Sequence, residues 1–205
     1  MKEGRVDGED LLFRKSAEEV LRHFIRFLIR WVGDDPDREG LRKTPDRMIR
    51  MWKEIFKGYN SDALPEVTVF ENGGDVKYTG MVIDHGYFFS VCEHHMVPFF
   101  GHYYFGYIPD KWLVGASKIG RVIDYFSARL QVQERLCEQV ADFFEEKLKP
   151  KGLIVLMRGR HLCKEMRGLR KYNSPFETIA VRGLFEKNVD GCKDEFMSRV
   201  LNIRD

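Results

Sequence analysis

The chain has few cysteines and no long apolar run, and each shortage excludes a class of protein. Four cysteines occur in 205 residues, at Cys92, Cys137, Cys163 and Cys192. Thiols this few and this widely spaced argue against a disulfide-bonded secreted scaffold and favour metal ligands or free thiols. The charged segment 1–7 lacks the apolar core of a signal peptide, and no later stretch approaches the ~20 apolar residues of a spanning helix. We therefore expect a soluble, cytoplasmic protein without a membrane partner.

The chain also lacks an excess of charge of either sign. Its 34 basic and 32 acidic side chains leave a formal net charge of +2, which gives no reason to expect a nucleic-acid partner. Any anion site must therefore come from local clustering. With 43% hydrophobic and 13% aromatic residues, the composition is that of a globular protein without a long disordered tract.

Helical patterns fill the first part of the chain, which we assign to an N-terminal tail and helical region over residues 1–62. After a tail of about ten residues, Ser16 and Glu19 form a capping box that predicts the start of one helix. Thr44 followed by Pro45 predicts the start of a second helix. The expected buried face of the second helix consists of Met48, Met51, Trp52, Ile55 and Phe56.

Residues 63–205 change to a mixed pattern of strands and helices, which we assign to a single second domain. The expected strands span residues 67–70, 78–91, 99–108, 153–157 and 178–185. The expected helices begin at Ser117, which can serve as a cap, at residue 132 and at residue 194. The order β-β-α-α-β-β, after two helices and before a short one, predicts the α+β class.

The segment from Ser90 to His95 carries the first candidate site. Cys92 and His95 have the C-x-x-H spacing that lets one turn deliver two ligands to a metal. His161 and Cys163 are two residues apart, so on a strand they would project to one face. Cys92, His95 and Cys163 would leave one zinc position open, as catalytic sites do. The alternative is that these are buried residues without a metal, because one C-x-x-H is a weak signal.

Basic residues form the second constellation. Ser117, Lys118 and Arg121 lie at a predicted helix start, where free amides favour a phosphate chain, and Arg167 follows Cys163 by four residues. Arg47 and Arg50 share one face of the second helix. Taken singly, each of these residues is better explained as an ordinary solvated surface residue, and it is their clustering beside the candidate metal ligands that favours a binding role.

The third constellation is the segment Gln131 to Arg135. The carboxylate of Glu134 could accept hydrogen bonds from the N1–H and 2-amino edge of a guanine. By itself the segment is better explained as a polar helix start with exposed side chains.

Together these segments closely resemble the GTP cyclohydrolase I family over roughly residues 16 to 202. The matching segments are Gly40-Leu41, Thr44-Pro45-Asp46-Arg47, Ser90-Val91-Cys92-Glu93-His94-His95, Pro98-Phe99-Phe100-Gly101, Tyr107-Ile108-Pro109, Gly115-Ala116-Ser117-Lys118, Gln131-Val132-Gln133-Glu134-Arg135, His161-Leu162-Cys163 and Met166-Arg167-Gly168. The resemblance implies a tunnelling fold, in which β-β-α-α-β-β units of several subunits close a barrel. It also implies a homo-oligomer, a decamer of two pentamers, with active sites between subunits.

The resemblance further implies a role for each candidate residue. Zinc, one ion per subunit, is expected on Cys92, His95 and Cys163. The guanine edge is expected on Glu134 with Gln133 beside it. The triphosphate is expected on Arg47, Arg50, Ser117, Lys118, Arg121 and Arg167, some of them from a neighbouring subunit. His94 and His161 match the catalytic histidines of the family, and we expect His161 to protonate the purine and His94 to serve the ring-opening or sugar steps.

The implied reaction is hydrolysis of GTP at C8 with loss of formate, followed by rearrangement to 7,8-dihydroneopterin triphosphate. This is the first step of pterin and folate-type biosynthesis. The segment Ser174 to Ile179, including Phe176, departs from the serine- and threonine-rich stretch usual in the family. The open alternatives are a nucleotide- or pterin-binding module without turnover, a purely structural zinc, a related enzyme acting on another pterin or a deazapurine, and iron in place of zinc.

Overall fold

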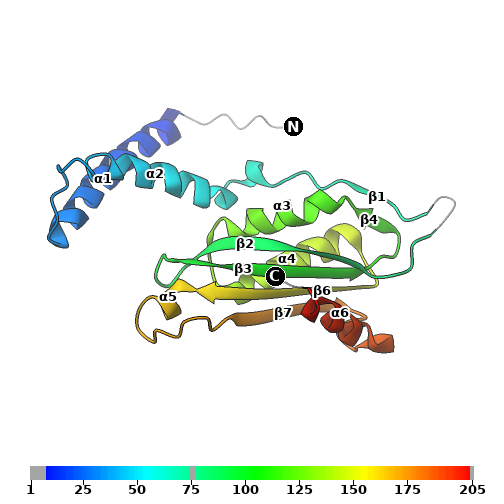
Figure 1. The fold of residues 1–205 in the computed structure, drawn as a ribbon. Coiled ribbons are helices and arrows are strands. Elements are labelled where there is room, and N and C mark those ends of the chain that lie inside the picture. The colour runs from blue at the N-terminus through cyan, green and yellow to red at the C-terminus, as the bar shows by residue number, and fades with distance from the viewer. Residues whose placement is uncertain (1–7, 74–76, 204–205) are drawn as a thin grey trace. The chain divides into compact units, whose positions relative to one another are not determined.

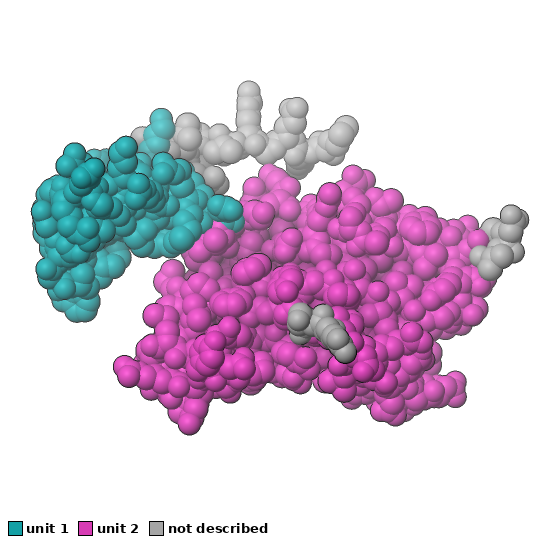
Figure 2. All heavy atoms as spheres, in the orientation of Figure 1, with its two compact units in different colours: residues 1–54 teal, residues 55–205 magenta. Residues whose placement is uncertain are grey.

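A computed structural model describes residues 8–73 and 77–203 of the chain (Figure 1). The chain divides into two compact units, residues 1–54 and residues 55–205, which Figure 2 colours separately. The expected domain boundary after residue 62 stays a prediction. In the described part of the chain, no helix combines the length and apolar character that a membrane crossing requires.

The N-terminal unit contains the helices α1 (Gly8–Trp31) and α2 (Thr44–Ile55). The predicted start of the first helix at Ser16 is wrong, because Ser16 lies inside α1. Residues 8–15 include leucine, lysine and arginine, which favour a helix and extend it past the capping-box pattern. Segment 1–7, the rest of the expected tail, lies outside the described residues.

The core of this unit is small, and it is built from isoleucines. Ile25 and Ile29 of α1 pack against Ile49 of α2, with Met48 and Trp52 at the edge. The second helix begins at Thr44 as predicted. Met51 was expected in the buried face and is 45% exposed, because Ile49 occupies that side of the helix instead.

The second unit is organised around a five-stranded sheet. Its strands, in spatial order, are β5 (Leu130–Gln131), β2 (Val82–Cys92), β3 (Pro98–Ile108), β6 (Gly152–His161) and β7 (Phe176–Gly183). All neighbours are antiparallel except β5 and β2. Two short strands, β1 (Val69–Glu71) and β4 (Trp112–Val114), pair separately. The long strands confirm the prediction, whereas β4 and β5 were missed because two or three residues carry no periodicity.

Helices cover both faces of this sheet. On one face lie α3 (Ala116–Ser127) and α4 (Gln133–Leu148), and on the other lies α6 (Cys192–Leu201). β6 is buried on both sides, with Val155 and Met157 toward α3 and α4 and with Ile154 toward α6. This double burial explains why the segment reads as a continuous apolar run. The observed order confirms the α+β class and the β-β-α-α-β-β succession.

Short helical turns complete the chain. They are α5 (Leu162–Glu165) and the 3-10 turns Lys57–Tyr59, Ser61–Ala63 and Val189–Gly191. The expected cap at Ser117 is wrong, because Gly115 takes the N-cap position of α3 and Ser117 lies within its first turn.

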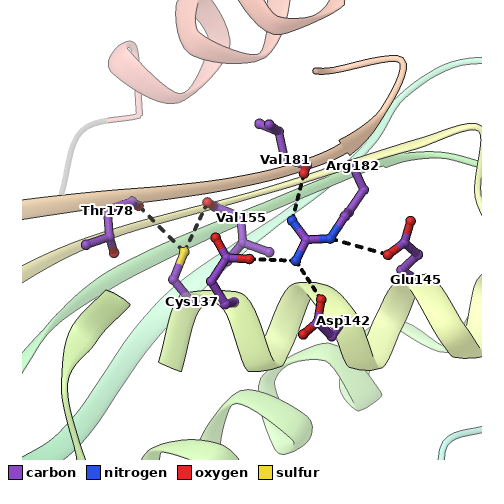
Figure 3. Close-up of polar contacts among 8 residues, drawn as sticks. Cys137, Asp142, Glu145, Val155, Thr178, Val181 and Arg182 are labelled. Carbon is purple, nitrogen blue, oxygen red and sulfur yellow. Dashed lines mark hydrogen bonds and ion pairs between the residues drawn. The ribbon is translucent and has the colours of Figure 1, made fainter. Parts of the chain in front are cut away.

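An arginine on the edge strand β7 holds α4 against the sheet (Figure 3). Arg182 Nη2 lies 2.6 Å from both Glu138 Oε2 and Asp142 Oδ1, and its Nε lies 3.3 Å from Glu145. In the residue directly before Glu138, the thiol of Cys137 donates to the carbonyls of Val155 and Thr178. Burial raises the pKa of Cys137 to about 11, so the thiol keeps its proton. These contacts fix the helix that carries Gln133 and Glu134.

We predict that Arg182→Met lowers the free energy of unfolding by about 1–2 kcal/mol, because it leaves three carboxylates clustered on α4 without their cation. Urea unfolding measures the loss, which should shrink at high salt as the repulsion is screened. The matched control is Arg199→Met, which removes an exposed pair within α6 and should cost much less. Equal losses in the two variants would contradict the claim that Arg182 holds α4 against the sheet.

Candidate metal and substrate site

The β2–β3 turn delivers the first two candidate ligands. Cys92 ends β2, its amide donates to the carbonyl of Val97 over 2.9 Å, and its carbonyl accepts from Met96 over 2.8 Å. Met96 has a φ of 53°, a left-handed conformation that closes this tight turn. The turn is therefore held by its own backbone.

A second set of contacts anchors the same turn to the neighbouring segment. The amide of Glu93 donates to the carbonyl of Gln131 over 3.0 Å. The Glu93 carboxylate accepts two hydrogen bonds from Arg135 of α4, at 2.6 and 3.1 Å. The ligand turn is thus fixed relative to the start of α4.

Cys163 joins these ligands from the opposite side of β3. It lies in the short helix α5, directly after β6 ends at His161, so the condition under which the two residues would share one face of a strand is not met. The ligand atoms of Cys92, His95 and Cys163 all lie within 4.8 Å of one another. Burial and the neighbouring Cys92 raise the pKa of the Cys163 thiol.

The donor set is chemically suited to zinc. Two sulfurs and an imidazole match a borderline-soft ion, and three protein ligands leave a fourth position open. Cys92 is buried and Cys163 half-buried, whereas His95 is exposed, so the centre opens on one side. A cation at this point would favour the thiolate forms and offset the raised pKa of Cys163.

Two further predicted residues lie beside the three ligands. Arg167 Nη1 is 3.1 Å from His95 Nε2, which places the expected cation next to the candidate metal centre. His94 Nδ1 lies 3.8 Å from the Cys92 sulfur, with the side chain exposed.

His161 is held between aromatic rings at the end of β6. Its ring stacks on Phe99 with 4.5 Å between centroids and an angle of 8°, and Phe176 meets it edge-on at 5.7 Å. Burial lowers the pKa of His161, and the charge of Glu134 partly opposes this shift. The ring is therefore fixed in orientation and biased toward its neutral form.

A pocket of about 250 Å³ brings these residues together. It is lined by Cys92, His94, Gln131, Val132, Gln133, Glu134, His161, Cys163, Lys164 and Phe176. Glu134 is exposed in the first turn of α4, whereas Gln133 beside it is fully buried. The pocket therefore combines the candidate metal centre with an exposed carboxylate and a half-buried imidazole.

The predicted phosphate-binding residues Ser117 and Lys118 lie at the end of α3 that is farther from the candidate metal ligands. The carbonyl of Ser127, at the end of α3, accepts from Ser90, two residues before Cys92. Ser117 precedes Ser127 by ten residues, which is about 15 Å along a helix. Lys118 and Arg121 share this first part of α3. Arg47 and Arg50 lie on α2 in the N-terminal unit, and their expected role stays a prediction.

Several pocket residues were not predicted. Lys164 directly follows Cys163, and its ammonium donates to the carbonyl and hydroxyl of Ser174. Phe176 was noticed only as a departure from the family pattern. The stacking of Phe99 on His161 follows from the pairing of β3 with β6, which places them opposite each other. The sequence alone could not predict this contact, because it depends on the register in which β3 and β6 pair.

The family model described as GTP cyclohydrolase I matches residues 21–201 of the chain. The chain belongs to the GTP cyclohydrolase I family. The match includes every candidate residue of the pocket and of α3.

Individual members of the GTP cyclohydrolase I family are similar along nearly their whole length. GTP cyclohydrolase 1 of Wolinella succinogenes is 42% identical over 186 residues, which cover 90% of this chain and 96% of that protein. The protein of the same name from Aquifex aeolicus is 41% identical over 91% of this chain and 98% of its own length. That from Clostridioides difficile is 41% identical, with coverages of 91% and 97%.

A solved structure, archaeosine synthase QueF-Like in the apo form, matches 52% of this chain and 97% of its own with a TM-score of 0.45 and 16% identity. This similarity is too low to support a conclusion.

Proposed function

We propose that the chain converts GTP to 7,8-dihydroneopterin triphosphate and formate with the help of zinc held by Cys92, His95 and Cys163. GTP cyclohydrolase I activity is the activity of the family to which the chain belongs. The proposal that zinc takes part in this reaction is supported by one observation. The three candidate ligands converge beside a pocket that is also lined by Glu134 and His161.

Each pocket residue has a proposed part. Glu134 accepts hydrogen bonds from the N1–H and 2-amino edge of guanine, which fixes the base in the pocket. His161 donates a proton to the purine, and His94 moves protons in the ring-opening or sugar steps, since imidazole can both donate and accept near neutral pH. When bound, zinc supplies a Lewis acid that lowers the pKa of water. Phe99 and Phe176 cover part of the His161 ring and hold its plane in place.

The triphosphate is proposed to lie among Ser117, Lys118 and Arg121 of one subunit and Arg167 of another, with Arg47 and Arg50 contributing. Ser117 lies about 15 Å along α3 from the end of the helix that contacts Ser90, near the metal ligands. This separation supports the arrangement, because a single chain does not bring its α3 residues next to its own Arg167. The tail of GTP would then bridge two copies of the chain.

The surface of α1 supports a homo-oligomer, for which we propose the family's decamer with one zinc per subunit. Large apolar side chains of this helix are 53–74% exposed, namely Val20, Phe24, Phe27 and Trp31. Contiguous exposed apolar surface of this kind marks an interaction site. A cytoplasmic location and the absence of a nucleic-acid partner remain predictions.

The decisive assay incubates the purified protein with GTP and follows formate and dihydroneopterin triphosphate by mass spectrometry. We expect both products, their loss after zinc is chelated, and their return when zinc is added. Cys163→Ser should lose both zinc and turnover, because it removes one of three ligands.

The matched control for this assay is Cys192→Ser, which changes a buried thiol that hydrogen-bonds Leu184 in the α6 core. It should keep zinc and turnover. GTP binding without either product in the zinc-loaded protein would contradict the proposed reaction and favour a binding module. Full turnover in the zinc-free protein would contradict the role of the metal.

A mixed-subunit experiment tests whether the site spans two chains. Cys163→Ser and Lys118→Met should each be nearly inactive alone, but co-assembled chains should recover about a quarter of the sites, because some sites draw both intact residues from different subunits. Co-assembly of Cys163→Ser with Cys92→Ser is the control, since both changes affect the same cluster and should give no recovery. Failure of the first pair to recover activity would show that each chain builds its own site.

A further inference from the structure

The side chain of Gln133 is fully buried at the first position of α4. Its amide nitrogen lies 2.8 Å from the carbonyl of Phe176, 3.0 Å from the carbonyl of Met157 and 3.2 Å from the hydroxyl of Thr178. Its amide oxygen lies 3.1 Å from Nε2 of His161. All the hydrogen-bonding atoms of the side chain are therefore engaged inside the protein.

These partners fix which way the amide points. Backbone carbonyls only accept, so the group facing Met157 and Phe176 must be the NH₂. A flipped amide would place its oxygen against two carbonyl oxygens and leave a buried acceptor unpaired, which is costly. The oxygen of Gln133 must therefore face His161.

The orientation of the amide in turn fixes the histidine. An amide oxygen cannot donate, so the hydrogen bond between Gln133 and His161 requires a hydrogen on Nε2. The neutral ring is then the Nε2–H tautomer, with Nδ1 as its free nitrogen. The stacked ring of Phe99 and the edge of Phe176 hold the imidazole plane in place.

Gly159 makes this contact possible. It lies on β6 two residues before His161, and a Cβ there would lie 2.2 Å from the Gln133 amide oxygen. A side chain at this position would displace the oxygen from His161. The absence of a side chain at Gly159 therefore leaves the space in which the Gln133 amide oxygen reaches His161.

We infer that Gln133 is a positioning residue that fixes His161 as the Nε2–H tautomer and leaves Nδ1 as the nitrogen that meets the substrate. The inference rests on the proposed role of His161 in proton transfer to GTP: Nδ1 of the neutral ring first takes a proton from water, and the resulting imidazolium then donates that proton from Nδ1 to the purine. It replaces the expectation that the Gln133 side chain holds the guanine edge, because such a contact would break the internal bonds of the amide. Glu134, which is exposed, holds that edge alone.

Steady-state kinetics with GTP distinguish a Gln133 that positions His161 from a Gln133 that binds the guanine edge. For Gln133→Met we expect kcat to fall roughly 10- to 1,000-fold while KM changes by less than about 3-fold, because a mispositioned acid affects the chemical step rather than binding. Gly159→Ala, which keeps the amide but displaces its oxygen, should show the same pattern. A KM raised 10-fold or more with kcat retained would overturn the inference.

Magic-angle-spinning NMR of the sedimented, zinc-loaded protein with ¹⁵N-histidine reads the tautomer directly. Comparison with His161→Gln assigns the His161 signals. We expect a protonated Nε2 and an unprotonated Nδ1 in the unaltered protein, and loss of this preference in Gln133→Met. A protonated Nδ1 in the unaltered protein would overturn the inference. This readout does not depend on turnover, so it separates a failed tautomer assignment from a failed reaction.

Thr178→Val is the matched control, because it removes one acceptor of the same amide and leaves two in place. It should lower thermal stability slightly and preserve both the tautomer and most of kcat. A loss of kcat equal to that of Gln133→Met, with the tautomer unchanged, would mean that the cluster only supports the fold and would overturn the inference.

Discussion

The register of β3 with its two neighbours is the constraint on which the site depends. Val91 pairs with Pro98 on one side of β3, and His161 pairs with Phe99 on the other. The ligand turn after β2 and the ligand helix after β6 therefore meet at the same end of the sheet. A slip of one residue would turn His161 and Cys92 to the opposite face and away from α4. The long apolar strands protect this register because many of their side chains that face α3 and α4, such as Phe88, Phe105 and Val155, are buried.

The helix α4 depends on the same sheet for its position. It is held at successive turns by the Gln133 amide, the Cys137 thiol and the Arg182 guanidinium, all of which bond to or come from β6 and β7. Glu134 and Gln133 occupy its first turn, so the carboxylate faces the pocket and the amide faces the histidine. The open edge of the site is instead made of exposed residues such as His94, His95 and Arg167, and in the proposed oligomer a neighbouring subunit covers it.

Much of this could be predicted from the sequence, because the periodicity of the long strands and helices and the spacing of Cys92 and His95 are local properties. The burial of Gln133 and the stacking of Phe99 on His161 could not be predicted, since they follow from strand pairing between distant segments. Whether Cys163 lies on a strand or in a helix could not be predicted, because nothing local indicates that β6 ends at His161. The separation of Ser117 and Lys118 from the metal ligands became apparent only when the direction of α3 relative to β2 was known.

X-ray absorption at the zinc edge of the loaded protein is the most direct measurement of the proposed centre. The arrangement of Cys92, His95 and Cys163 predicts two sulfurs at ~2.3 Å, one imidazole nitrogen at ~2.0–2.1 Å and one light atom from solvent that changes when GTP is added. A closed shell of four protein ligands, or fewer than two sulfurs, would contradict a catalytic zinc at this end of the sheet.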